Sequence, residues 1–65
     1  MIEDQINEAK IFWARFKEYC GKEQDYPVVD ISRISSFAPD WVLLGYTSRE
    51  GAFDGRRFQT DFELS

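Results

Sequence analysis

The sequence predicts an α+β domain in which one N-terminal amphipathic helix packs on a small three-stranded antiparallel sheet (α-β-β-β). Three observations support this fold class: apolar residues recur at helical spacing over residues 2–20, a β-branched run follows at 26–32, and residues 57–64 alternate between apolar and polar. A chain of 65 residues has the length of one small domain, which we expect to span residues 1–65.

The first predicted element is the helix over residues 2–20. Glu3 and Asp4 lie in its first turn, where the positive end of the helix dipole favours acidic side chains. Gly21 can adopt the positive φ that commonly ends a helix, so we expect the helix to stop there. The apolar stripe lies within about 40° of one direction and contains Ile2, Ile6, Ala9, Trp13, Phe16 and Cys20.

Three strands are predicted after this helix, at residues 26–32, 41–47 and 57–64. The first is rich in β-branched residues, the second is apolar on both faces, and the third alternates strictly. A turn at Glu50-Gly51, or a wider loop, pairs the second and third strands so that their core-facing residues meet. The predicted core contains Ile6, Trp13, Phe16, Trp41, Leu43, Phe58 and Phe62.

Two features predict contact with another macromolecule. One helix covers only one face of a sheet, which leaves Val42, Leu44 and Tyr46 together on the uncovered face. The connection between the second and third strands combines arginine with an aromatic residue, as protein interfaces often do. Its candidate contact residues are Arg49, Phe53, Arg56 and Arg57. We therefore predict that this sheet face and this loop bind a partner.

The sequence offers little for catalysis or metal binding, and we expect no enzyme, no metal and no cofactor. It contains no histidine, and its single cysteine, Cys20, lies on the central line of the helix stripe and is predicted to be a buried apolar residue. Asp61 and Glu63 share one predicted strand face and could hold a hard cation. Such pairs more often form a solvated face, here beside Arg57.

The charge balance bears on the class of partner. Twelve acidic residues against eight basic ones give a net charge of −4, which disfavours nucleic acid because binding to phosphates needs a basic surplus. No apolar run approaches the roughly 18 residues of a membrane span, and we expect no leader before Glu3-Asp4. Small secreted domains usually carry several cysteines, so we expect a cytoplasmic protein.

The leading interpretation is a small acidic protein-interaction module that acts as an inhibitor, adaptor or accessory subunit. Its partner is another protein or a second copy of the chain, and its size and charge resemble those of regulators carried by phages and mobile elements. Two alternatives stay open. One is an acidic mimic of nucleic acid that covers a basic surface with the acids at 4, 8, 18, 23 and 25. The other is a small domain that binds nucleic acid or a small ligand.

Overall fold

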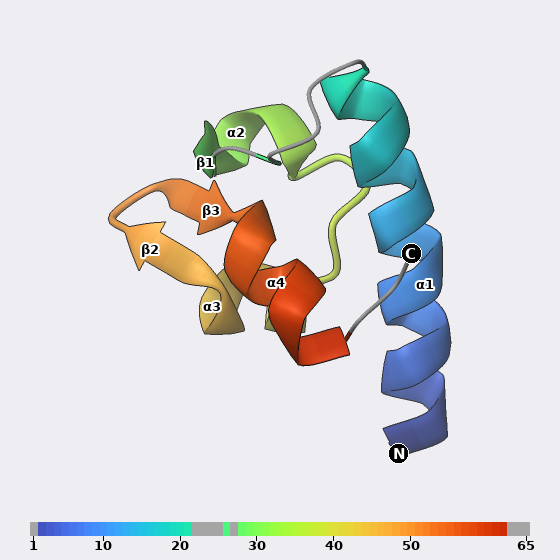
Figure 1. Ribbon diagram of the computed structural model, residues 1–65. Helices are drawn as coiled ribbons and strands as arrows, with labels where there is room; N and C mark the ends of the chain where they lie inside the picture. Colours follow the sequence, from blue (N-terminus) through green and yellow to red (C-terminus); the bar gives the residue numbers. More distant parts are fainter. Residues whose placement is uncertain (1, 22–25, 27, 63–65) are drawn as a thin grey trace.

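The computed structural model describes residues 2–21, 26 and 28–62 of the 65-residue chain. It has an α+β fold, in which an N-terminal helix is followed by a three-stranded antiparallel sheet and further short helices (Figure 1). The fold class predicted from the sequence is therefore confirmed. In chain order the elements are α1 (Ile2–Cys20), β1 (Val28–Asp30), α2 (Ile31–Ile34), α3 (Asp40–Gly45), β2 (Thr47–Arg49), β3 (Ala52–Asp54) and α4 (Gly55–Phe62).

Helix α1 has the predicted bounds and ends at Cys20, because Gly21 adopts the left-handed conformation with a φ of +66°. The Gly21 N–H donates to the carbonyl oxygens of Lys17 and Glu18, at 3.1 and 3.2 Å. Cys20, predicted to be buried, is half-buried and packs against the core. The buried side of the helix is formed by Ala9, Phe12, Trp13 and Phe16.

The sheet has the strand order β1-β3-β2, so that β3 is its central strand and runs antiparallel to both neighbours. Phe53 on β3 pairs with Val29 on β1 and with Thr47 on β2. The turn between β2 and β3 lies at Glu50-Gly51, one of the two connections that the sequence allowed. Each strand has three residues, and Phe53 is the strand residue that is fully buried. The sheet therefore contributes to the core mainly through one aromatic ring.

The predicted strand at 41–47 is wrong, because residues 40–45 form the short helix α3. Pro39 occupies the N-cap position with a φ of −64°, which its ring fixes, and it leads directly into the first turn. The four consecutive apolar residues that follow fit a buried helix segment as well as a buried strand. The apolar pattern alone therefore does not distinguish the two structures.

The predicted strand at 57–64 is also wrong, because α4 occupies residues 55–62; positions 63 and 64 lie outside the described residues. The side chain of Asp54 accepts hydrogen bonds from the backbone N–H groups of Arg56 and Arg57, at 3.0 and 3.4 Å, and so caps this helix. Phe58 and Phe62 are four residues apart, a spacing that places them on one face of a helix as well as of a strand.

The predicted strand at 26–32 is shorter than expected. Strand β1 covers Val28–Asp30, residues 31 and 32 begin α2, and position 27 lies outside the described residues. The Asp30 carboxylate ends the strand because it accepts hydrogen bonds from the backbone N–H and the hydroxyl of Ser32, both at 3.0 Å. The bond from the Ser32 backbone, followed by that from its hydroxyl, lowers the pKa of Asp30 below its ordinary value.

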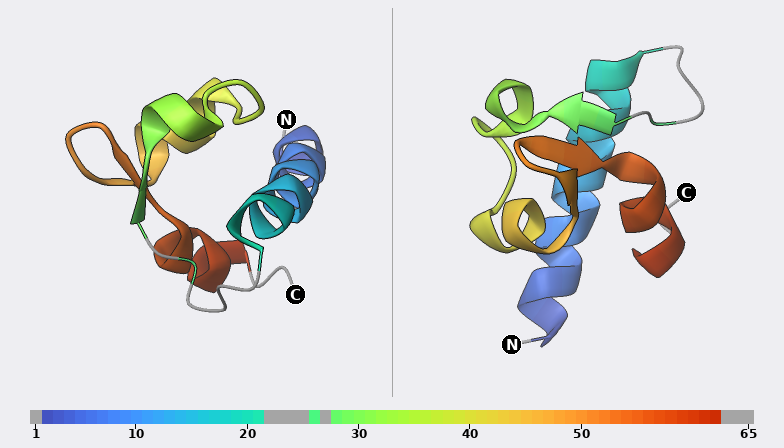
Figure 2. Two further views of the ribbon diagram at one scale, coloured as in Figure 1. Left: turned by 90° about the horizontal axis from the view of Figure 1, so that it is seen from above. Right: turned by 90° about the vertical axis from the view of Figure 1, so that its left-hand side faces the viewer.

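The core is a set of interlocked aromatic rings that α1, the short helices, the hairpin and α4 surround (Figure 2). Phe12 on α1 meets the rings of Phe53 and Phe58 edge to face, with centroids 5.3 and 5.2 Å apart. The N-terminal helix therefore packs on the sheet and on α4 through its aromatic side chains. The buried apolar residues are Ala9, Phe12, Trp13, Phe16, Ile34, Ala38, Val42, Phe53 and Phe58.

The predicted core is confirmed in part. Its fully buried members are Trp13, Phe16 and Phe58. Its half-buried members, which pack against the buried residues, are Trp41, Leu43 and Phe62. Ile6, predicted to be core, is instead 38% exposed. The first turns of α1 extend past α3 and α4, so the rest of the described chain does not cover this side chain fully (Figure 1).

Candidate protein-binding surface

The predicted uncovered face does not exist as such, because its residues belong to α3 rather than to a strand. Side chains that are two positions apart share a face in a strand, whereas in a helix they point about 200° apart. Val42 accordingly turns inward and is 0% exposed, while Leu44 turns outward and is 84% exposed. The prediction of an exposed Val42 is therefore wrong. Leu44 is the most exposed large apolar side chain among the described residues.

Phe53, predicted to belong to the contact loop, is also fully buried. It lies on the central strand β3, and its ring packs against Phe12 and Phe16 at centroid distances of 5.3 Å each. A partner could reach Val42 or Phe53 only if the core opened. Both residues are therefore excluded from the surface described below.

Leu44 lies one helical turn after Trp41, on the same side of α3. Trp41 belongs to a group of half-buried aromatic rings. The Trp41 ring lies 6.4 Å from the Tyr46 ring and 5.8 Å from the Phe62 ring, measured between centroids. Tyr46 and Phe62 in turn lie 6.0 Å apart. We call these four residues, Trp41, Leu44, Tyr46 and Phe62, the Leu44 surface.

Hydrogen bonds hold the polar edges of this surface in place. The Trp41 indole N–H donates to Oε1 of Glu8 on α1, at 3.1 Å. The Tyr46 hydroxyl is hydrogen bonded to Asp61 on α4. Burial of the ring, followed by the negative charge of Asp61 and this hydrogen bond, raises the pKa of Tyr46 above its ordinary value. The hydroxyl therefore keeps its proton and acts as a donor at neutral pH.

The three predicted arginines are exposed, but they lie at different places on the molecule. The Arg57 guanidinium carbon lies 5.5 Å from the centroid of the Tyr46 ring, within the range of a cation–π contact. Arg49 instead lines a shallow depression on the sheet with Val28 and Ala52. Arg56 lies in the first turn of α4. Of the three, Arg57 is the one that the described contacts join to the Leu44 surface.

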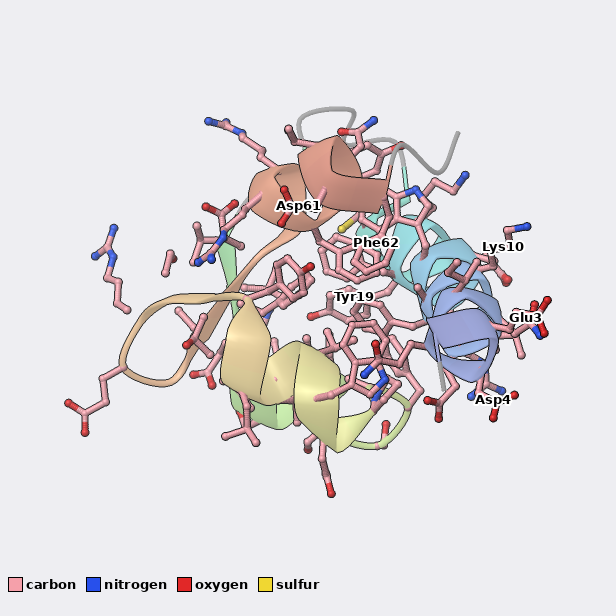
Figure 3. All side chains as sticks on the ribbon, turned by 90° about the horizontal axis from the view of Figure 1, so that it is seen from below. Glu3, Asp4, Lys10, Tyr19, Asp61 and Phe62 are labelled. Carbon is pink, nitrogen blue, oxygen red and sulfur yellow. The ribbon has the colours of Figure 1, made fainter. Side chains whose placement is uncertain are left out.

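Three acidic side chains adjoin the Leu44 surface. Figure 3 views the molecule from the end where α1 begins and shows Asp61 on α4, whereas Glu3 and Asp4 lie on the outer side of α1. Glu8 binds Trp41, and Asp40 precedes Leu44 by one helical turn on the same side of α3. We call the three acidic residues Glu8, Asp40 and Asp61 the acidic rim.

The described residues contain no group of three or more acidic, cysteine or histidine side chains that could hold a metal ion. Asp61 lies beside Tyr46, and its predicted companion Glu63 is outside the described residues. None of the described helices has the length and apolar character that crossing a bilayer requires.

The sequence analysis missed several members of this surface. Trp41 and Phe62 were assigned wholly to the core, and Glu8 and Asp61 were not recognised as their polar neighbours. A helix over 40–45 would have placed Leu44, Trp41 and Asp40 on adjoining positions of one side. The Pro39-Asp40 start was the signal for that helix.

No protein-family model, curated protein or solved structure matches this chain.

Proposed function

We propose that this chain is a protein-interaction module that binds another protein through the Leu44 surface and serves as an inhibitor, adaptor or accessory subunit. The observation that carries the proposal is the 84% exposure of Leu44 next to half-buried Trp41. Covering one such leucine contributes about 1.5–3 kcal/mol. Tryptophan, tyrosine and arginine are the residues most enriched at energetic centres of interfaces.

The fixed positions of the neighbouring rings support the same proposal. Glu8 holds Trp41, and Asp61 and Arg57 hold Tyr46 on two sides. A surface that is ordered before binding loses less conformational freedom when the partner arrives. A cytoplasmic location, and a relation to regulators of phages or mobile elements, belong to this proposal as well and rest on the size, charge and cysteine content of the chain.

Leu44→Asp tests the proposal. Because Leu44 is exposed, the variant should keep its stability within about 0.5 kcal/mol. Proteins that co-purify with the tagged chain are compared with those that co-purify with Leu44→Asp and with Ile11→Asp, a matched change at an exposed apolar position on α1. The partner is retained by the unchanged chain and Ile11→Asp and lost by Leu44→Asp. In a titration with that partner purified, Leu44→Asp should weaken binding by about 30-fold.

Two results would contradict the proposal. One is equal binding by the unchanged chain and Leu44→Asp when both have the same stability. The other is an unfolded Leu44→Asp, which would mean that Leu44 is part of the core.

An acidic mimic of nucleic acid stays a second proposal, supported by the exposure of Asp4, Glu8 and Glu18; positions 23 and 25 lie outside the described residues. Binding by charge alone should weaken steeply as salt rises and should not depend on Leu44. Leu44→Asp measured at two salt concentrations therefore separates the two proposals.

A further inference from the structure

The charges around the Leu44 surface are strongly unequal. The acidic rim supplies three negative charges, whereas Arg57 is the positive side chain that the described contacts join to this surface. Two of the acids are fixed next to the apolar contact, since Glu8 binds Trp41 and Asp61 binds Tyr46. Any group that covers the surface therefore enters a negative field.

This field decides between classes of occupant. A two-fold dimer through the Leu44 surface would place each acidic rim against its own copy, because both subunits present the same patch. Like charges brought together in this way oppose association. Nucleic-acid phosphates and anionic lipid headgroups carry the same sign and are repelled for the same reason.

The arrangement of apolar and acidic residues adds a second requirement. On α1, Glu8 accepts a hydrogen bond from the indole N–H of half-buried Trp41. On α3, Leu44 lies one helical turn after Asp40. Apolar and acidic side chains thus lie side by side on this surface. A partner that complements them must carry apolar and basic residues side by side, as a basic amphipathic helix does.

We propose that the partner of the Leu44 surface is a basic amphipathic helix of another protein, whose apolar side chains contact Leu44 and Trp41 and whose lysines or arginines face the acidic rim. This inference rests on the proposed protein-binding function and adds the chemistry of the partner to it.

The test uses the full chain and three synthetic 18-residue helical peptides of one pattern. One contains leucine and lysine; in the other two, glutamine or glutamate replaces every lysine. Fluorescence anisotropy of each labelled peptide is followed at 50 and 300 mM salt. The lysine peptide should bind about tenfold more tightly than the glutamine peptide at low salt, and the glutamate peptide should bind most weakly.

Two double variants with equal net charge locate the effect. Glu8→Gln with Asp40→Asn removes two charges of the acidic rim, and the glutamine carbonyl can still accept the Trp41 N–H. Glu18→Gln with Glu50→Gln removes two charges from exposed positions on α1 and at the hairpin turn. The first pair should weaken the lysine peptide by about threefold or more, and the second should change it less than about 1.5-fold. Leu44→Ser should weaken the lysine and glutamine peptides alike.

Each failure has a distinct meaning. If the lysine and glutamine peptides bind equally well and Leu44→Ser weakens both, the partner is not basic, but the protein-binding function stands. If Leu44→Ser leaves the affinity for the lysine peptide unchanged, the proposal that a partner binds at the Leu44 surface is wrong. No binding of the lysine peptide overturns this inference. A chain that light scattering shows as a dimer, and that Leu44→Asp makes monomeric, overturns it in favour of a second copy.

Discussion

The two halves of α1 carry the same apolar stripe but lie in different surroundings. In the second half, Ala9, Phe12, Trp13 and Phe16 are buried. In the first half every side chain from Glu3 to Glu8 is exposed, Ile6 included, because the first turns extend beyond α3 and α4 (Figure 1) and Glu8 is the residue that reaches Trp41 of α3. Helical periodicity therefore identifies which side of a helix is apolar, but it does not reveal where the rest of the chain covers that side.

The covered half is fixed by rings from several other elements. Phe12 meets Phe37, Phe53 and Phe58 at centroid distances of 5.7, 5.3 and 5.2 Å. These partners come from the loop before α3, from β3 and from α4. The uncovered half has Ile6 beside Glu3 and Asn7 of its own helix. The same stripe thus stabilises the fold in one half and leaves Ile6 partly exposed in the other.

The largest expected effect separates the halves directly. Phe12→Ala should cost about 3–5 kcal/mol of the free energy of unfolding, because it leaves a cavity among four rings. Ile6→Ala should cost about 1 kcal/mol, since a partly exposed side chain loses less burial. Urea denaturation followed by circular dichroism measures both. Because a small domain has about 5 kcal/mol in total, Phe12→Leu serves as a milder second variant. Equal losses of unfolding free energy at the two positions would contradict the difference between the two halves of α1.

A smaller effect is expected where α4 begins against the covered half. A Cβ on Gly55 would lie 2.8 Å from Cε2 of Phe16 and 3.1 Å from Cβ of Tyr26. The Phe16 ring is fully buried and cannot easily move aside. Gly55→Ala should therefore lower the free energy of unfolding by about 1–3 kcal/mol, measured by urea denaturation.

Gly45→Ala is the matched control for that change. Gly45 ends α3 and is exposed, and a Cβ added to it would meet nothing within 4 Å. Alanine there should leave stability unchanged or raise it by up to about 1 kcal/mol. If Gly55→Ala proved as neutral as Gly45→Ala, α4 would not be held tightly against α1.

The sequence predicted the larger features of this fold better than its short elements. The bounds of α1 followed from a periodicity that has one interpretation, and the turn at Glu50-Gly51 was one of two connections that the sequence allowed. The segments 41–47 and 57–64 were wrongly predicted as strands, because short apolar runs and the Phe58–Phe62 spacing satisfy a strand and a helix equally. Their caps, Pro39 and Asp54, act over one turn and are weaker signals than periodicity.

The candidate surface could likewise be predicted from the sequence only in part. Leu44, Tyr46 and Arg57 were expected at a contact surface, and the structure places Leu44 outward and Arg57 over Tyr46. Val42 was expected beside them, and its burial follows from the helical rather than extended backbone. The contacts from Glu8 to Trp41 and from Asp61 to Tyr46 join residues far apart in the chain. Such pairs depend on tertiary packing, which no local pattern encodes.

The smallest expected effect concerns Tyr46, at the end of the molecule where α1 is uncovered. Burial first, and then Asp61, raises its pKa above the ordinary value of 10.0, so the folded chain holds this proton more tightly than the unfolded chain does. Its contribution to stability is therefore complete below about pH 10 and is lost as pH rises through the folded-state pKa. Urea midpoints at pH 8, 10 and 11 should fall more for the unchanged chain than for Tyr46→Phe, which has no hydroxyl to ionise. Parallel curves for the two chains would mean that the Tyr46–Asp61 hydrogen bond does not hold this surface in solution.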